Sequence, residues 1–243
     1  MIARRDGRSR QEQIAADLRA QIMSGDLPVG AQLPPTQQML AHYSTSPATV
    51  QRALASLEDE GFIDRKPGRG IYVRDRQSFI VRVSAYFAPT PRGYSYKLLD
   101  VGEVRPPVDA AKVLELNNGM TAILRHRLMS HDGVPVELSW SYYPLQLATG
   151  TPLAGRAKIP GGAPRVLADL GYPQLYFRDY ISSRAPTTEE LEALEMPDNV
   201  PVMRQFRMVY SHNDQPVEVT VMIKPAHLYE LEYQEIITPS PED

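Results

Sequence analysis

The stretch SPATVQRALASLEDEG, residues 46–61, decides the fold of the first part of this chain. Ser46 is a good helix cap, and Pro47 suits the first helical position, where its missing N–H costs no hydrogen bond. Apolar residues then recur with the period of an α-helix at Val50, Ala53, Leu54 and Leu57. Gly61 is typical of a helix end. The stretch therefore predicts an amphipathic helix with one buried stripe.

Two more helices are expected before this one. Ser9 and Glu12 have the spacing of a capping box, and the apolar residues Ile14, Leu18 and Ile22 follow at intervals of four. A connection rich in proline and glycine leads to a second, short helix with Met39, Leu40 and Tyr43 on its apolar side. Because only a few residues separate the second helix from the third, the pattern predicts a helix-turn-helix.

A pair of short strands is expected after the third helix. Phe62-Ile63 and Ile71-Tyr72-Val73 flank the basic turn Lys66-Pro67-Gly68-Arg69-Gly70. Glycine allows a close backbone approach, and Lys66 and Arg69 can neutralise phosphates. This is the pattern of a β-wing beside a helix-turn-helix, in which the start of the second helix of the motif enters the major groove of DNA.

These residues resemble the GntR family of bacterial regulators. The resemblance covers Gln11 to Val73 and rests on two motifs, Gly-x-Leu-x-x-Gly-x-x-Leu-Pro before the second helix and Ser-x-x-Thr-Val-x-x-Ala-Leu-x-x-Leu-x-x-x-Gly in the third. The chain has Gln37, Pro47 and Gln51 where the family commonly places arginines that touch DNA. The base contacts therefore do not transfer, although glutamine reads adenine through two hydrogen bonds. The expected DNA-binding residues are Gln37, Ser46, Ala48, Thr49, Gln51, Arg52, Gly68, Arg69 and Gly70.

Length and composition agree with more than one globular domain. The chain has 243 residues, 42% of them hydrophobic, no cysteine and a net charge of −3. Residues 1–76 carry a net charge of +2 and the remainder −5, so one basic part precedes an acidic one. We find no apolar run long enough to span a membrane, and we expect a cytoplasmic, nucleoid-associated protein.

The second part of the chain contains an internal repeat. Leu114-Glu115-Leu116 is followed by Arg125-His126-Arg127, a turn and Pro135-Val136-Glu137. About eighty residues later, Leu194-Glu195-Met196 is followed by Gln205-Phe206-Arg207, a turn and Pro216-Val217-Glu218, with one residue inserted. Each copy predicts a short helix followed by a β-hairpin.

The alternation along these hairpins separates a polar face from an apolar one. The polar positions are Arg125, Arg127, Glu137, Ser139, Ser141, Glu218 and Thr220. Two interpretations stay open, because such a face is either washed by solvent or lines a cleft that binds a ligand.

The same residues resemble the UTRA domain of the HutC subfamily within GntR, over about residues 80–237. That resemblance implies a chorismate-lyase-like antiparallel sheet with helices, and a small-molecule ligand, the effector. Arg125 and Arg127 match the anion-binding strand of the family, and Glu137, Ser139, Glu218 and Thr220 complete the expected site. The family's phosphate motif, Gly-Ser-Leu-Tyr, is replaced by residues 162–165, Gly-Ala-Pro-Arg, so the identity of the effector stays open.

Together these expectations define an α+β protein. Residues 1–76 form a winged helix-turn-helix domain, 77–91 a linker, 92–238 the effector-binding and dimerisation domain, and 239–243 a tail. We expect a homodimeric regulator, a repressor of transcription, that binds double-stranded operator DNA and an anionic effector, with no cofactor, metal or catalytic site. Two alternatives remain, a constitutive repressor whose second domain only dimerises and a chorismate-lyase-like enzyme.

Overall fold

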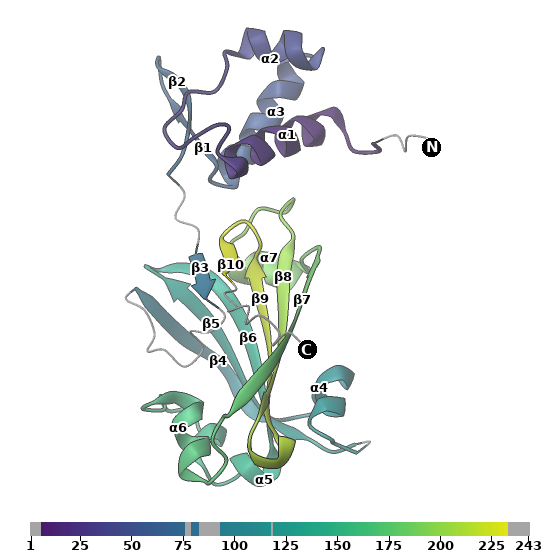
Figure 1. The fold of residues 1–243 in the computed structure, drawn as a ribbon, viewed down its shortest axis with the longest axis vertical. Helices are drawn as coiled ribbons and strands as arrows, with labels where there is room; N and C mark the ends of the chain where they lie inside the picture. The colour runs from purple at the N-terminus through teal and green to yellow at the C-terminus, as the bar shows by residue number, and fades with distance from the viewer. Residues whose placement is uncertain (1–5, 76–78, 83–92, 118, 233–243) are drawn as a thin grey trace, which may run out of the picture. The chain divides into compact units, whose positions relative to one another are not determined.

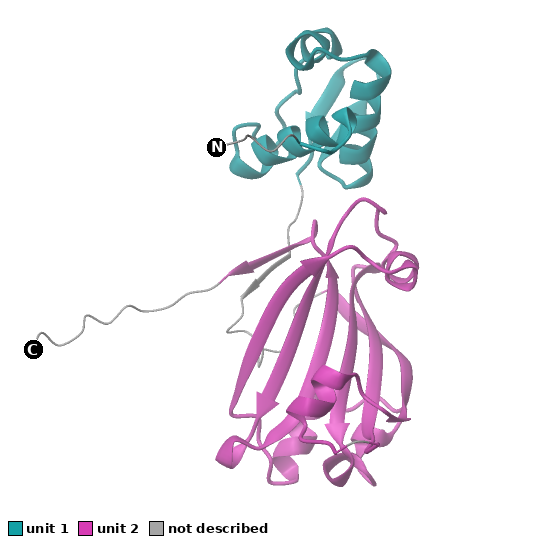
Figure 2. Ribbon diagram, turned by 90° about the vertical axis from the view of Figure 1, so that its right-hand side faces the viewer, with its two compact units in different colours: residues 1–78 teal, residues 79–243 magenta. Residues whose placement is uncertain are grey.

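A computed structural model describes residues 6–75, 79–82, 93–117 and 119–232. The chain divides into two compact units, residues 1–78 and 79–243 (Figure 2). The mixture of helices and antiparallel strands confirms the α+β expectation. Within the described ranges, no helix is both long and apolar enough to cross a lipid bilayer.

The first unit contains the expected helices and hairpin (Figure 1). Its elements are α1 (Arg10–Ser24), α2 (Thr36–Tyr43), α3 (Pro47–Asp59), β1 (Ile63–Lys66) and β2 (Gly70–Val73). The capping box at Ser9 and Glu12 is formed, and the Ser46 side chain accepts a hydrogen bond from the backbone N–H of Thr49 at the start of α3. The core includes the predicted stripe of α3 together with Ile14, Leu18, Leu33, Met39, Phe62, Ile63 and Val73.

Strands β1 and β2 form an antiparallel pair with Ile63 opposite Val73 and Lys66 opposite Gly70. Gln32 adds an isolated bridge to Tyr72, so the connection before α2 is tied to the wing. Gly68 and Gly70 have φ values of 70° and 118°. Side chains rarely adopt this backbone conformation, which explains the glycines at the tip of the wing.

The second unit is built on a six-stranded antiparallel sheet with strand order β4-β5-β6-β9-β8-β7. Its strands are β4 (Tyr94–Val104), β5 (Ala122–His131), β6 (Val134–Pro144), β7 (Tyr176–Arg184), β8 (Val202–Tyr210) and β9 (Pro216–Pro225). Its helices are α4 (Val108–Val113), α5 (Leu145–Ala148), α6 (Gly162–Asp169) and α7 (Thr188–Leu194), with the 3₁₀ turns η2 (Pro152–Ala154) and η3 (His212–Asp214).

The strand order confirms the internal repeat and extends it by one strand. One copy runs β4, α4, β5, β6 and the other runs β7, α7, β8, β9, so each helix and hairpin has a strand before it. The two copies meet where β6 pairs with β9, and β4 and β7 lie at opposite edges of the sheet. The sheet therefore consists of two equivalent halves.

The two faces of the sheet carry different cores. On one face, α4 and α7 cover the apolar side chains Leu124, Leu138, Tyr142, Phe206, Val219 and Ile223. On the other face, α5, η2 and α6 pack on Ile123, Tyr143, Val209 and Val217. Figure 1 shows α5 and α6 grouped at one end of the sheet. The remainder of that second face carries the polar residues of the two hairpins, and we call it the polar face.

The expected linker contains a strand. Phe79–Arg82 forms β3, which pairs in parallel with β10 (Tyr229–Glu232), with Phe79 opposite Tyr229. The sequence Phe-Ile-Val is rich in strand formers, but the polar residues just before it are typical of a connection. Residues 77–78 and 83–91 of that expected linker, and the expected tail at 239–243, lie outside the described residues.

Candidate nucleic-acid interface and ligand pocket

The first turns of α3 present most of the predicted DNA-binding side chains. Ser46, Ala48, Gln51 and Arg52 are exposed and Thr49 is half-buried. The Ser46 and Thr49 hydroxyl oxygens lie 2.9 Å apart. These two residues cap the helix start, while the longer side chains of Gln51 and Arg52 extend from the exposed side of α3.

A hydrogen-bonded chain connects α3 to the wing. The Arg65 Nη1 donates to the Gln51 Oε1 at 2.8 Å, and the Arg65 Nε donates to the Glu58 Oε2 at 2.7 Å. Sequence reasoning missed Arg65, because it belongs to the strand before the basic turn and no local pattern pairs it with α3. Arg65 is exposed, and it positions the Gln51 amide from the side of the wing.

The tip of the wing is fixed through the Arg69 carbonyl. That oxygen accepts hydrogen bonds from the Gln32 Nε2 and the Tyr72 hydroxyl, each at 3.0 Å. The Lys66 Nζ lies 4.7 Å from the centre of the Tyr72 ring. The side chain of Arg69 is exposed, as are Gly68 and Gly70, so the wing presents a hydrogen-bonded backbone with a cationic side chain.

The predicted DNA-binding residue outside α3 and the wing is Gln37, at the second position of α2, and it is also exposed.

The polar face of the sheet brings the predicted effector residues together. Arg127 lies opposite Ser139, and Arg125 lies opposite Ser141, which in turn lies opposite Thr220. All belong to the positions that sequence alternation placed on one face, with Glu137 and Glu218 on the same strands. Arg125, Ser139, Ser141, Glu218 and Thr220 are buried, so this face is not simply washed by solvent in its centre.

A row of hydrogen bonds crosses the middle of the polar face. The Arg127 Nη2 donates to the Ser141 Oγ at 2.5 Å, and that oxygen lies 2.8 Å from the Thr220 Oγ1. Thr220 donates to the Glu218 Oε1 at 2.7 Å. The other carboxylate oxygen of Glu218 accepts a hydrogen bond from the Gln174 Nε2, also at 2.7 Å.

Arg125 holds the turn that follows α5. Its Nη1 donates to the carbonyl oxygens of Leu153 and Gly155 at 3.0 and 2.6 Å, and to that of Pro152 at 3.3 Å. Its side chain is only 2% exposed, and this burial lowers the pKa of the guanidinium. Arg125 therefore stabilises the turn at residues 152–155 and also lines the pocket described below.

Glu137 forms an ion pair with Lys224, which lies at the same face of the sheet on β9. The Lys224 Nζ also lies 5.1 Å from the centre of the Tyr229 ring, which connects the pair to β10. Burial raises the pKa of Tyr229, and the negative charge of Glu137 raises it further. Lys224 was not among the predicted site residues because it lies on β9, far from Glu137 in the sequence, and no local pattern indicates their pairing.

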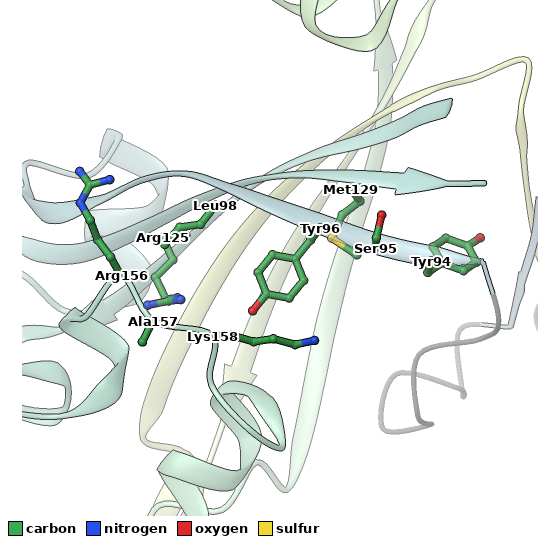
Figure 3. A pocket seen from close by; sticks show the side chains of 9 residues that line it. All are labelled: Tyr94, Ser95, Tyr96, Leu98, Arg125, Met129, Arg156, Ala157 and Lys158. Carbon is green, nitrogen blue, oxygen red and sulfur yellow. The ribbon is translucent and has the colours of Figure 1, made fainter. Parts of the chain in front are cut away.

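A cavity of about 430 Å³ lies between β4, β5 and the segment 156–158 (Figure 3). The cavity is lined by Tyr94, Ser95, Tyr96, Leu98, Arg125, Met129, Arg156, Ala157 and Lys158. Figure 3 shows the side chains of Tyr96 and Lys158 extending into the space between their segments. Of the predicted effector residues, Arg125 alone lines it, while Arg127, Glu137, Ser139, Glu218 and Thr220 lie elsewhere on the polar face.

Arg156 and Lys158 add two cationic side chains that sequence reasoning missed. Arg156 is exposed and lies 3.4 Å from the Asp100 carboxylate. No periodic pattern marks these residues, since they belong to a segment without regular structure. Arg165, which stands in the segment that replaces the family's phosphate motif, is exposed and pairs with Asp169 one helical turn later at 3.0 Å.

A second arginine on the polar face was present in the repeat but was not predicted as part of the site. Arg207 donates to both oxygens of Asp179, from its Nε at 2.8 Å and its Nη2 at 2.6 Å. The Gln205 Nε2 donates to the same carboxylate at 2.8 Å. Since Arg207 occupies the position of Arg127 in the second copy, the repeat itself was the signal that would have found it.

A helix-turn-helix with a wing, carried on one chain with a second unit that contains a cationic pocket, defines a DNA-binding transcription regulator with an effector-binding domain. The family profile described as bacterial regulatory proteins, gntR family, matches residues 10–73, and that of the UTRA domain matches residues 91–230. The chain belongs to the GntR family, and its second unit is a UTRA domain, as in regulators of the HutC type.

The chain is also similar in sequence to a curated regulator and in fold to solved structures. An HTH-type transcriptional regulator of Streptomyces coelicolor is 28% identical over 224 residues, which cover 83% of each chain. The crystal structure of a GntR-family regulator has a TM-score of 0.61 at 22% identity and covers 95% of this chain and 99% of its own. The C-terminal domain of the histidine utilization repressor of Pseudomonas syringae has a TM-score of 0.51 at 15% identity, covering 59% of this chain and 99% of its own.

Proposed function

We propose that this protein is a homodimeric repressor whose affinity for operator DNA is controlled by a small anionic effector. The observation that carries the proposal is the cavity of the second unit, to which Arg125, Arg156 and Lys158 contribute cationic side chains. Arginine and lysine favour carboxylate or phosphate ligands. A regulator with such a pocket has the means to respond to an anionic metabolite.

The proposed DNA contacts fall into two groups. Gln51 and Arg52 read base edges from α3, while Ser46, Ala48 and Thr49 fit the helix start against the groove. Gly68, Arg69 and Gly70 bring the wing to the phosphate backbone, and Gln37 contacts DNA from the start of α2. Arg65 joins the first group because it holds the Gln51 amide.

A dimer follows from the way such motifs read DNA. Two recognition helices related by a two-fold axis bind the halves of an inverted repeat, about one helical turn apart. A bound effector then changes the population of arrangements that fit this spacing. The histidine utilization repressor shares the fold of the second unit, and its name supports repression as the proposed role.

The proposed effector site extends from the cavity across the polar face. Arg125 and Arg127 attract the anion, and Glu137, Ser139, Glu218 and Thr220 offer polar contacts to the rest of the molecule. Three of these residues already have partners in Lys224, Ser141 and Gln174, so a ligand on this face replaces existing contacts of the side chains.

The test is a mobility shift with the full chain on its own upstream intergenic DNA, at two salt concentrations and with random DNA as competitor. We expect a shift that resists the competitor, and release of the DNA by one member of a panel of anionic metabolites. A shift that random DNA removes completely would contradict the proposal. Recovery of the releasing compound unchanged distinguishes a sensor from a chorismate-lyase-like enzyme.

A second candidate is favoured by one observation. Glu137 and Glu218 already have partners within the domain, as expected if the polar face only stabilises a dimerisation domain. In that case the protein is a constitutive repressor. Specific DNA binding that no anionic metabolite releases, together with a dimer in solution, would support this candidate over the first.

A further inference from the structure

The two halves of the duplicated sheet allow each residue of the polar face to be compared with a counterpart. Arg127 on β5 corresponds to Arg207 on β8, because the repeated motifs align and their partners on the inner strands, Ser139 and Thr220, also correspond. On the outer side, Arg127 lies opposite Leu98 of β4, whereas Arg207 lies opposite Asp179 of β7. The two halves therefore differ at one decisive position, which is leucine in one and aspartate in the other.

The second half shows how this scaffold holds a carboxylate. The two nitrogens of the Arg207 fork and the amide of Gln205 donate to the two oxygens of Asp179, at 2.6 to 2.8 Å. The side chains of Arg207 and Asp179 are only 5% and 6% exposed. A planar carboxylate with two oxygens matches the geometry of a guanidinium fork, which is the strongest arrangement available to either group.

The first half has a cavity beside the corresponding position. Leu98, the counterpart of Asp179, and Arg125, the counterpart of Gln205, both line the cavity of about 430 Å³. Arg156 and Lys158 lie across from them (Figure 3). None of the described residues that line this cavity is acidic. The first half thus has Arg127 at the position of Arg207, three further cationic side chains at the cavity, and open space beside Leu98.

We infer that the cavity beside Leu98 binds a carboxylate group of the effector, next to the position that corresponds to the Asp179 carboxylate in the other half of the sheet. This inference rests on the proposed function and narrows its anion to a carboxylate. The remaining walls, which include Tyr94, Tyr96 and Met129, suit a compact organic body, and the volume lies in the range of small-molecule sites.

The repeat also indicates how Arg127 responds. In this structure Arg127 donates to Ser141, whereas the residue of the second copy that corresponds to Ser141 is Met222, which has no hydroxyl. Arg207 turns to the outer strand and its carboxylate instead. A carboxylate in the cavity therefore draws Arg127 away from Ser141 toward β4. That movement breaks the row of hydrogen bonds from Arg127 through Ser141 to Thr220.

The experiment replaces the missing carboxylate with one attached to the chain. Leu98→Asp places a carboxylate at the position of Asp179, and Leu98→Asn is the matched control of the same shape without the charge. The probes are succinate, benzoate and inorganic phosphate at equal ionic strength, with binding to the full chain measured by calorimetric titration and by thermal unfolding. We expect the wild-type chain to bind succinate or benzoate more tightly than phosphate.

In Leu98→Asp we expect the carboxylate probe to bind at least about tenfold more weakly than in Leu98→Asn, because a covalent carboxylate competes at far higher local concentration. Phosphate binding equal to or tighter than both carboxylates in the wild-type chain would overturn the inference. So would the absence of any carboxylate binding, or equal binding by the two variants. DNA is absent from this experiment, so release of operator DNA by phosphate compounds would leave the proposed function standing while the inference failed.

A second variant keeps the inference testable if position 98 does not tolerate a polar residue. Asp179→Ala removes the internal carboxylate and leaves Arg207 and Gln205 facing a small gap. We expect its lowered unfolding temperature to be raised by acetate in a saturable way, and not by chloride at the same ionic strength. Equal effects of acetate and chloride would show that this arrangement of side chains does not select carboxylates.

Discussion

The Nη1 of Arg65 donates a hydrogen bond to the Oε1 of Gln51 at 2.8 Å, which joins the first strand of the wing to the exposed side of α3. The same guanidinium is anchored by Glu58. A glutamine needs both its oxygen and its nitrogen to recognise adenine. In the proposed function, Arg65 orients that amide, so we expect the two residues to act together in base recognition.

Gln51→Ala is expected to weaken operator binding selectively. A lost contact of this kind costs about 1–3 kcal/mol, or roughly 5-fold to 150-fold in affinity. Affinity for random DNA should stay within a factor of two of the wild type, since no phosphate contact is lost. Fluorescence anisotropy with both DNAs at one salt concentration measures the difference. Equal losses on the two DNAs would remove Gln51 from base recognition.

Arg65→Ala is expected to weaken operator binding, and this loss should depend on the presence of Gln51. In a double-mutant cycle with Gln51→Ala, the two losses on operator DNA should sum to more than the loss in the double variant, because the second change removes a partner that is already gone. Asp64→Ala is a matched control, since Asp64 lies beside Arg65 but faces Arg74 at 3.7 Å. Strictly additive losses would show that the hydrogen bond plays no part in recognition.

Arg69→Ala is expected to weaken binding to all DNA sequences to a similar degree. Log affinity falls as log salt concentration rises, and each phosphate contact that is lost reduces the magnitude of this slope by about one. Titrations at four salt concentrations with operator and random DNA measure that slope. An unchanged slope with a loss confined to the operator would place Arg69 at a base instead.

Arg125→Met is expected to destabilise the second unit by about 2–4 kcal/mol, because the carbonyl oxygens of the turn at 152–155 lose their buried donor. Lys97→Met is the control, since Lys97 is exposed on the neighbouring strand. Urea unfolding followed by Trp140 fluorescence measures the second unit alone, because this tryptophan is the single one in the chain. A cost equal to that of the control would show that Arg125 has no structural role.

Glu190 makes the stability of the second unit depend on pH. Burial alone would raise its pKa, but hydrogen bonds from Arg184 and Thr187 outweigh burial and hold the pKa below its usual value of 4.5. A carboxyl group whose pKa is lowered in the folded state stabilises the fold above pH 4.5, and this contribution is lost as the pH falls through the folded value. Glu190→Gln should therefore lower the free energy of unfolding at pH 7, with a difference that shrinks below pH 4.5. A difference that is constant between pH 3 and pH 7 would contradict this.

Much of the fold could be predicted because local signals agree with one another. In the first unit, cap, apolar stripe and terminal glycine all marked α3, and the core contains every residue of that stripe. In the second unit, the repeat identified the two hairpins at the centre of the sheet. Strand β3 was missed because its partner β10 lies at the opposite end of the domain sequence, and no local pattern specifies so distant a pairing.

The candidate site was predictable only where it follows strand alternation. The side chains of Arg125, Arg127, Ser139 and Thr220 share a face because alternation is a property of any strand. Arg156 and Lys158 come from an irregular segment, and Lys224 and Asp179 join the face through pairings between distant strands. Such neighbours are set by tertiary structure, which has no period in the sequence.

The pairing of β3 with β10 has a consequence for biosynthesis. Phe79 and Tyr229 are separated by some 150 residues, so this contact closes a long loop late and at an entropic cost. The helices of the first unit, in contrast, contact neighbours that are close in the chain. During translation we therefore expect the DNA-binding unit to complete its fold before β10 has left the ribosome and can pair with β3. A chain truncated before residue 229 would carry a finished DNA-binding head on a domain whose first strand stays unpaired.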